Sequence, residues 1–192
     1  EYAYRPFDKR FVYYDTKLIE RPREILMKNF IGHDNIALLT CRQIAGNEWS
    51  HVSIDNHIID DCRVSNKTKE RGYVFPLYLY TNEFGKETKV ANLNDEEWQK
   101  FNNSIGRITP PEELLAYIYA VLHSPSYRER YKEFLKVDFP RIPLPTSESE
   151  FVRLAQIGQQ LIDLHMMRNT QSWKCDTTFP EPGSQQIDML KW

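Results

Sequence analysis

The stretch TPPEELLAYIYAVLHSPSYRERYKEFL, residues 109–135, decides the fold class of the second half of this chain. Thr109 and Glu112 have the spacing of a helix capping box, and Pro110 between them suits a first helical position. Apolar residues at helical spacing then predict a buried stripe of Leu114, Leu115, Ile118, Val121 and Leu122. Ser124 and Pro125 predict a second helix, with an inner face of Tyr127, Tyr131, Phe134 and Leu135. The stretch therefore predicts two helices joined by a tight corner.

The residues after this pair predict one more helix. Alternate prolines from Pro140 to Pro145 exclude a helix and favour an extended connector. Ser147 and Glu150 form a second capping box, and the apolar residues that follow keep helical spacing until a predicted end near Arg168. Beyond residue 170 the pattern is mixed, and residues 187–192 suit a strand.

The residues before this region favour β-structure, because aromatic and β-branched residues are separated by short polar turns. The predicted strands are residues 11–14, 36–43, 51–54 and 73–80, with a short helix opening on Pro22 and a hairpin turn near residues 82–85. We therefore predict an α+β fold with a β-rich N-terminal lobe followed by a helical C-terminal lobe. The predicted limits are 1–92 for the β-rich lobe, 93–170 for the helical lobe and 171–192 for a tail, with the lobes joined near residues 92–103.

Composition and charge restrict the classes of function. The chain has 192 residues, lacks an apolar run near the roughly 20 residues that cross a bilayer, and lacks a signal-peptide layout at its start. We expect a cytoplasmic protein with no membrane partner. Three cysteines far apart in the sequence predict neither a disulfide framework nor a paired metal site. The net charge of −2 does not by itself indicate DNA binding, because DNA-binding proteins usually carry surplus Lys and Arg.

The sequence patterns of common active sites are absent. The seven glycines include no G-x-G cluster that would hold S-adenosylmethionine, and the five histidines form no metal-binding pair. Glu87 and Lys89 supply half of a nuclease E-x-K pattern, but they follow turn residues and better fit an exposed hairpin. Asp55, Asp60 and Asp61 lack the spacing of a calcium loop. We therefore predict no catalytic residue, no metal site and no cofactor in this chain.

Two polar groups have the side chains that read nucleic acid. Residues 65–71 mix amide and hydroxyl groups with three cations in a predicted loop, and two more polar residues end a predicted strand. Asn and Gln can pair with adenine, and Arg or Lys with guanine. The predicted DNA-binding residues are Arg42, Gln43, Ser65, Asn66, Lys67, Lys69 and Arg71. A plain polar surface turn explains the same composition equally well.

A basic N-terminal run supplies further candidates for phosphate contact. These residues are Arg5, Lys9, Arg10, Arg21 and Arg23. Aromatic and acidic residues alternate with them, so internal ion pairs and cation–aromatic stacking remain an alternative.

Several long strings, in this order, resemble one protein family. They include Tyr4–Asp8 (YRPFD), Arg21–Arg23 (RPR), Arg42–Gln43 (RQ), Ser65–Thr68 (SNKT), Tyr73–Tyr80 (YVFPLYLY), Tyr117–Pro125 (YIYAVLHSP), Asp138–Pro143 (DFPRIP) and Leu161–His165 (LIDLH). The chain resembles, over nearly its whole length, the C-terminal target-recognition (specificity) domain of type ISP restriction-modification enzymes and related single-chain N6-adenine DNA methyltransferases.

The resemblance implies a bacterial DNA-binding module that selects a double-stranded site for the methyltransferase domain of the same polypeptide. S-adenosylmethionine would serve that domain, and Mg²⁺ and ATP would serve a nuclease and a motor in type ISP members. Such a module would lie with the nucleoid. Family members continue past the region of residues 182–184, so the tail is expected to begin a truncated C-terminal subdomain. Base-reading positions vary with the recognised sequence, so the resemblance does not assign them.

Two other functions stay open at this level. The chain could be an interaction module that contacts the rest of the same enzyme without reading bases. It could also be a small metal-dependent nuclease that uses Glu87 and Lys89.

Overall fold

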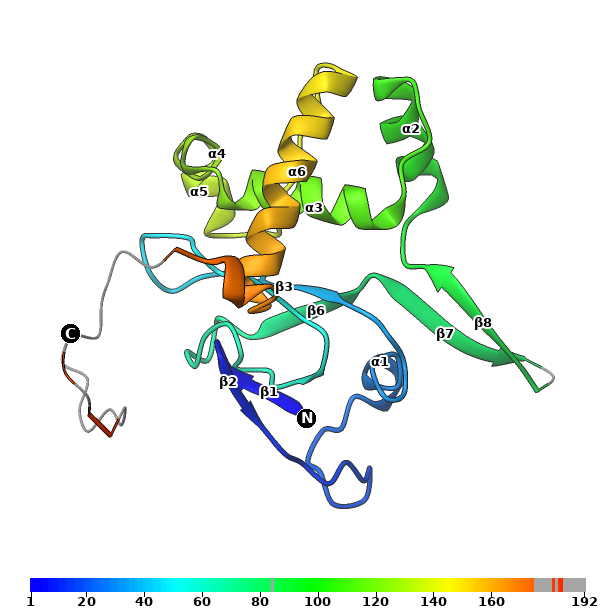
Figure 1. Ribbon diagram of the computed structural model, residues 1–192, viewed down its shortest axis with the longest axis vertical. Coiled ribbons are helices and arrows are strands. Elements are labelled where there is room, and N and C mark those ends of the chain that lie inside the picture. Colours follow the sequence, from blue (N-terminus) through cyan, green and yellow to red (C-terminus); the bar gives the residue numbers. More distant parts are fainter. Residues whose placement is uncertain (84, 175–180, 182, 185–192) are drawn as a thin grey trace.

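The computed structural model of the chain describes residues 1–83, 85–174, 181, 183 and 184. Among them every strand lies before residue 92 and the longer helices follow, so the predicted α+β class is confirmed (Figure 1). The strands are β1 (Tyr2–Arg5), β2 (Asp8–Arg10), β3 (Ala37–Cys41), β4 (Val52–Asp55), β5 (Ile58–Ile59), β6 (Gly72–Pro76), β7 (Tyr78–Glu83) and β8 (Lys86–Ala91). The helices are α1 (Glu24–Met27), α2 (Asp95–Ile105), α3 (Pro111–His123), α4 (Pro125–Arg130), α5 (Lys132–Leu135), α6 (Glu148–His165) and the 3-10 turn η1 (Thr170–Ser172).

The strands of the described residues form three small sheets, in the orders β2-β1-β5, β4-β3-β6 and β7-β8. β3 is the central strand of the second sheet and is antiparallel to both of its neighbours. Leu39 and Cys41 on β3 are 0% exposed. A strand covered on both faces needs a nearly continuous apolar sequence, which explains why the ALLTC run occupies the centre.

The predicted strand over residues 73–80 is wrong as one element, because β6 ends before Leu77 and β7 belongs to another sheet. The buried Asn35 side chain explains this break. It accepts a hydrogen bond from the Tyr78 N–H (3.1 Å) and donates one to the Tyr78 carbonyl (2.8 Å), replacing strand partners. The chain therefore leaves the second sheet and enters the β7–β8 hairpin, which projects from the body of the molecule (Figure 1).

The N-terminal segment contains two further differences from the predictions. Residues 11–14 form no strand, and Phe11 is 89% exposed, because β1 and β2 pair earlier and leave this segment without a partner strand. The predicted helix at Pro22 begins two residues later, since Arg21 and Arg23 have left-handed φ values of 56° and 51°. The predicted strand at residues 187–192 lies outside the described residues.

The predicted junction between the lobes contains an additional helix, α2. Asn94 caps it by accepting a hydrogen bond from the Glu97 N–H at 3.0 Å. Phe101 and Ile105 on α2 are buried. The signal was present in the sequence, since Asn followed three residues later by Glu is a helix-start pattern.

The predicted capping box at the start of α3 is wrong, because Pro110 rather than Thr109 is the N-cap residue. Thr109 is 0% exposed, and its hydroxyl donates to Asn102 Oδ1 (2.7 Å) and accepts from Trp98 Nε1 (3.2 Å). It therefore ties the start of α3 to α2. For α6, the predicted cap is confirmed at Ser147, whose side chain accepts from the Glu150 N–H at 3.2 Å. The returning half of the box differs, because the Glu150 carboxylate accepts from the Thr146 N–H at 2.7 Å.

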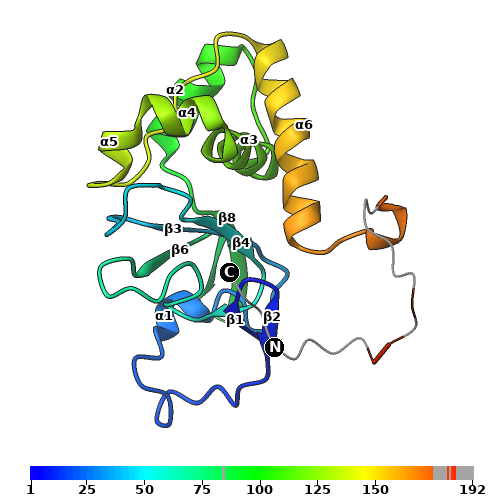
Figure 2. The same cartoon turned by 90° about the vertical axis from the view of Figure 1, so that its left-hand side faces the viewer.

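Helices α3 and α6 form the centre of the helical lobe and pack closely where Gly158 meets Ala116. Their core continues into the β-rich lobe, because Trp49, Val52 and Ile54 belong to the same buried cluster as the helices. Figure 2 shows α6 descending to the β-rich lobe. The limits of 92 and 170 stay predictions, and the largest core lies across the first of them. None of the described helices is long and apolar enough to cross a bilayer.

Candidate nucleic-acid interface

Two loops of the β-rich lobe carry all seven predicted DNA-binding residues. Loop A, residues 42–50, follows β3, and its Arg42 and Gln43 side chains are exposed. Arg42 Nε donates to Asp138 Oδ1 at 3.2 Å, so this guanidinium is held at the surface by an ion pair. The Ile44 N–H donates to a carbonyl just after α5 (3.2 Å), which fastens loop A to the helical lobe.

Loop B, residues 61–71, leads into β6. Its exposed residues include Asn66, Lys67, Lys69 and Arg71. Arg71 forms an ion pair with Asp61 at the opposite end of the same loop. This contact closes loop B at its base, and the Gly72 N–H adds a hydrogen bond to the Asp61 carbonyl at 2.8 Å.

Glu70 joins the two loops. Its side chain is 1% exposed although it carries a carboxylate. Oε1 accepts the Ala45 N–H of loop A at 2.7 Å, and Oε2 accepts the Ser65 hydroxyl of loop B at 2.5 Å. Oε2 also lies 2.9 Å from His51 Nε2. The Glu70 carbonyl accepts the Cys41 thiol at 2.9 Å, so the contacts extend to the end of β3.

The electrostatics of Glu70 follow from these contacts. Burial opposes ionisation of this carboxyl, but hydrogen bonds from Ser65, the Ala45 N–H and His51 outweigh it and lower the pKa to about 2. An ionised carboxylate only accepts hydrogen bonds, so His51 Nε2 carries the proton in this contact. In a Ser-His-Glu catalytic triad, the histidine lies between the serine and the carboxylate. Here Ser65 and His51 each contact the Glu70 carboxylate directly, so the three residues do not have the arrangement of a triad.

The structure brings the predicted loop residues together. Cys41 pairs with Gly72 in the β3–β6 register, so Arg42 leaves one strand beside the point where Arg71 enters the next. Of the seven residues, Ser65 differs from the rest because its hydroxyl is directed to the buried Glu70. That the others contact bases stays a prediction.

The five predicted phosphate-contact residues lie elsewhere, on β1, β2 and the segment that follows. Arg5 contacts Asp60 at 2.9 Å and Arg10 contacts Asp8 at 2.9 Å, while both guanidinium groups lie over the Tyr4 ring at 3.9 and 3.8 Å. Arg5 and Arg10 therefore form the internal ion pairs and cation–aromatic contacts that were the alternative to phosphate contact. The others are Lys9, which lies 3.8 Å from Glu1, Arg21, which lies 3.4 Å from Glu20, and the exposed Arg23.

A group of aromatic side chains beside loop A was missed by the sequence patterns. Tyr73 and Phe75 on β6 are 44% and 42% exposed and meet Phe139 edge to face, with ring centroids 4.9 and 5.8 Å apart. Arg42 lies 6.0 Å from the Phe139 ring. The alternation of exposed residues along β6 was readable in the sequence, but the approach of Phe139 from a distant segment was not.

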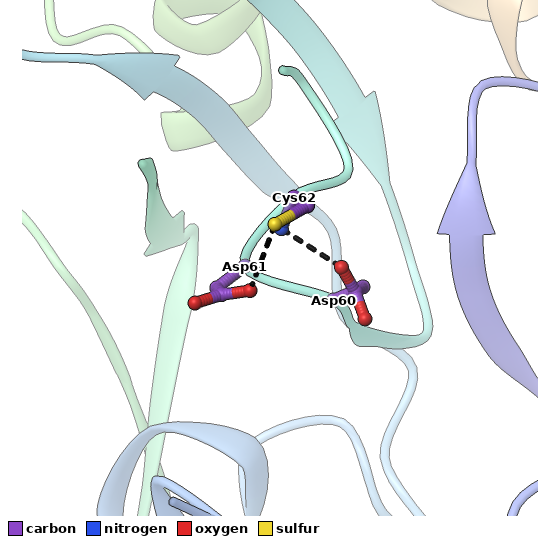
Figure 3. Close-up of side chains that lie close together, drawn as sticks. All are labelled: Asp60, Asp61 and Cys62. Carbon is purple, nitrogen blue, oxygen red and sulfur yellow. Dashed lines mark hydrogen bonds between the residues drawn. The ribbon is translucent and has the colours of Figure 1, made fainter. Parts of the chain in front are cut away.

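Asp60, Asp61 and Cys62 lie close enough to suggest a metal site (Figure 3). Their groups already have other partners. Asp60 accepts hydrogen bonds from Tyr2, Arg5 (2.9 Å) and the Cys62 N–H (2.8 Å), and Asp61 pairs with Arg71. These contacts describe a turn that anchors β1 to loop B, and they leave little free carboxylate for a cation.

Glu87 and Lys89, the half-motif of a nuclease, have partners other than a metal-binding group among the described residues. Glu87 lies 3.6 Å from His33, and the Lys89 ammonium lies 3.9 Å from the centre of the Tyr78 ring. In the described part of the chain, neither residue belongs to a cluster that could hold a metal ion. Lys89 contacts a ring within the β7–β8 hairpin, and Glu87 joins the hairpin to the loop between α1 and β3.

A surface hollow of about 560 Å³ lies between the segment before α1, α1 itself and the loop that follows it. Its lining is Tyr14, Asp15, Thr16, Lys17, Glu24, Lys28, Ile31 and His33. Neither loop A nor loop B contributes to it, so it belongs to a different surface from the predicted DNA-binding residues.

Solved structures that are similar to this chain include three that contain DNA or a DNA substrate mimic. The complex of DrdV with DNA matches with a TM-score of 0.70 and 27% identity, over 89% of this chain and 16% of that one. The ATP-dependent Type ISP restriction-modification enzyme LlaBIII bound to DNA matches with a TM-score of 0.69 and 25% identity, over 86% and 10%. A nuclease-deletion mutant of the Type ISP enzyme LlaGI, with a DNA substrate mimic, matches with a TM-score of 0.64 and 23% identity, over 86% and 13%.

The chain thus spans 10–16% of the length of these three proteins. A comparison with curated proteins finds no match. The family model of the Type ISP C-terminal specificity domain matches residues 1–192. The predicted resemblance is confirmed, and the chain belongs to the Type ISP C-terminal specificity domain family.

Proposed function

We propose that this chain recognises a double-stranded DNA sequence through loops A and B and does no chemistry itself. The observation that carries this proposal is the set of hydrogen bonds from Ala45 and Ser65 to the Glu70 carboxylate, called the Glu70 clamp below. The clamp holds the two polar loops side by side, with their side-chain amides and cations exposed. The three similar structures, all solved with DNA or a DNA mimic, support DNA as the partner.

The exposed side chains suit readout of base edges and contact with phosphates. Gln43 and Asn66 have the amide groups that can pair with adenine, and Arg42 has the fork that pairs with guanine. Lys67 and Lys69 would contact the phosphate backbone and set the position of the loops on the duplex. Arg42 must exchange its Asp138 contact for DNA, which links its use to the helical lobe.

The parent enzyme supplies the chemistry in this proposal. A methyltransferase domain of the same polypeptide would use S-adenosylmethionine to modify an adenine that loops A and B help to locate. A nuclease and a motor in the parent would use Mg²⁺ and ATP. The enzyme would act on the nucleoid in the cytoplasm. Family membership and the much greater length of the similar enzymes support this division of labour.

A salt titration of duplex binding tests the proposal. The net charge of −2 predicts weak binding by this chain alone, with an affinity that falls as salt rises. The double substitution Lys67→Ala and Lys69→Ala should make the negative slope of log affinity against log salt shallower by about 2, because each phosphate contact contributes about −0.9 to it. A matched double substitution of exposed cations in the helical lobe, Lys100→Ala and Arg153→Ala, should leave the slope unchanged.

Other results would favour the alternatives. Equal slopes for wild type and the loop B variant would show that DNA is held elsewhere and would favour an interaction module. Magnesium-dependent cleavage that is lost in Glu87→Ala would favour the nuclease. We expect no such cleavage, because Glu87 and Lys89 contact His33 and Tyr78 instead of a common metal position.

A further inference from the structure

We propose that Glu70 is a positioning residue for sequence recognition, because its carboxylate sets the relative placement of loops A and B. This inference rests on the proposed function. One carboxylate oxygen accepts from loop A at Ala45, and the other accepts from loop B at Ser65. The two loops are therefore joined through a single functional group.

Few buried apolar side chains hold the two loops, and the other ion pairs and hydrogen bonds of each loop do not join loop A to loop B. Most of their residues are exposed and polar, and Trp49 is the main apolar side chain of loop A that is buried. Burying an ionised carboxylate is costly unless it is fully hydrogen-bonded. Glu70 meets that condition with three donors, from Ala45, Ser65 and His51. An apolar residue could fill the same space, but it could not orient three donors on separate segments.

This arrangement changes the role of Ser65. Its hydroxyl donates to the clamp at 2.5 Å and is half-buried, whereas Asn66 and Lys67 beside it are exposed. Ser65 therefore orients its neighbours in loop B. Lys67 is also close to Glu70, since its ammonium lies 3.9 Å from Glu70 Oε1, but its side chain is exposed. A shift of the clamp would move the exposed ends of both loops relative to each other.

The substitution Glu70→Gln isolates this role because it keeps the size of the side chain. A glutamine has one acceptor oxygen and an NH₂ group, while the donors of the two loops face both carboxylate oxygens. If the NH₂ takes the place of Oε1, it meets the Ala45 N–H and loop A is released. If it takes the place of Oε2, Ser65 and His51 must change from donors to acceptors, and all three hydrogen bonds lose the charge that strengthens them. Thr109→Val is the matched control, because it removes two buried hydrogen bonds in the helical lobe without touching either loop.

The test combines hydrogen exchange of the free protein with selection from a pool of randomised DNA duplexes. In Glu70→Gln, amides of loops A and B should exchange at least about tenfold faster while those of α3 and α6 keep their protection. The enrichment of the motif selected by the wild type should fall about tenfold or more, with the salt slope unchanged. Thr109→Val should keep both the motif and the loop protection.

Each outcome decides a different point. An unchanged motif and enrichment in Glu70→Gln would overturn the inference, as would an equal loss of selectivity in Thr109→Val. If Glu70→Gln does not fold, Glu70→Asp gives the same test, because the charge is kept but one methylene less cannot reach both loops. If the wild type selects no motif, the proposed function itself fails. If the wild type selects a motif and Glu70→Gln selects the same one, only the inference about Glu70 fails.

Discussion

At the scale of the residue, the buried charged side chains in the described part of the chain, Asp55, Arg63 and Glu70, each have a specific partner. The side chains of Asp55 and Arg63 are each 5% exposed, and Arg63 Nη2 donates to Asp55 Oδ2 at 3.1 Å. Glu70 is buried more deeply and has neutral donors at Ala45 and Ser65 besides His51. Removing one partner of such a group leaves a buried charge unpaired, which costs more than losing a surface ion pair.

Glu70 should stabilise the fold in a way that depends on acid pH. Its pKa in the folded state is about 2, below the ordinary value of 4.5, so its stabilisation is complete above pH 4.5 and is lost as pH falls toward 2. The shift corresponds to about 3 kcal/mol at neutral pH. Denaturant unfolding between pH 6 and pH 3 should show a shallower loss of stability in Glu70→Gln than in wild type. Parallel curves for the two proteins would contradict the assignment.

A second titrating group joins α3 to α6. Tyr119 is 0% exposed, burial raises its pKa above the usual range, and its hydroxyl donates to His165 Nδ1 at 2.5 Å. Burial lowers the pKa of His165 and is also the main cause of the lowered pKa of His123, whose ring lies 5.2 Å away. Protonation of His165 would reverse this hydrogen bond, so that Nδ1–H donates to the Tyr119 hydroxyl oxygen, and would place a positive charge on a half-buried ring.

This histidine contact predicts that acidification weakens the helical lobe. Because the folded-state pKa lies below 6.5, the unfolded chain binds more protons as pH falls through 6.5, and stability falls with it. Thermal unfolding at pH 7.5 and pH 5.5 should show a lower melting temperature at pH 5.5. His165→Gln keeps an acceptor without titrating, so its two melting temperatures should differ less. An equal difference in both proteins would exclude His165 as the cause.

At the scale of the element, the close approach of α3 and α6 decides how the helical lobe packs. A Cβ atom added at Gly158 would lie 1.8 Å from the Ala116 carbonyl oxygen. Backbone at this distance cannot give way locally, so the helices touch only because residue 158 has no side chain. The sequence shows Gly158 inside a helix, where it is unfavourable for the helix itself, and the packing explains why it is there.

The substitution Gly158→Ala should therefore destabilise the protein. A gain of about 1 kcal/mol in helix propensity is outweighed by overpacking, whose cost reaches about 3 kcal/mol or more, so we expect a net loss of about 2 kcal/mol in chemical unfolding. Gly46→Ala is the control, since its nearest neighbour is the flexible end of Lys67 at 4.0 Å. That variant should stay within about 0.5 kcal/mol of wild type. A stabilised Gly158→Ala protein would refute the close packing.

At the scale of the whole molecule, the two lobes are not independent. The main buried cluster takes Trp49, Val52, Ile54 and Leu77 from the β-rich lobe and packs them with α2, α3 and α6. Figure 1 shows the strands of the second sheet running beneath the helices. Loop A is attached to the helical lobe as well, through Arg42 and Asp138. Disturbing either lobe should therefore affect the predicted DNA-binding surface.

The shared core predicts that both lobes unfold together. Ile54 on β4 is 1% exposed, and Ile54→Ala should cost about 2–5 kcal/mol through lost burial and the cavity that remains. Calorimetry should show a single transition in wild type and in the variant, at a lower temperature in the variant. Hydrogen exchange should become faster in α3 and α6 as well as in the strands. Two separate transitions would support independent domains with a boundary near residue 92.

The sequence by itself determined the local features: the helical stripe after residue 109, the Ser147 cap and the polar character of loops A and B. These depend on residues within one or two turns of each other, so spacing and side-chain type suffice. Only the tertiary structure decided what Glu70 and Asn35 do, because their partners lie up to 25 and 43 residues away. Hydrogen bonds between distant segments form only after the core has placed those segments together, and no local pattern records that placement.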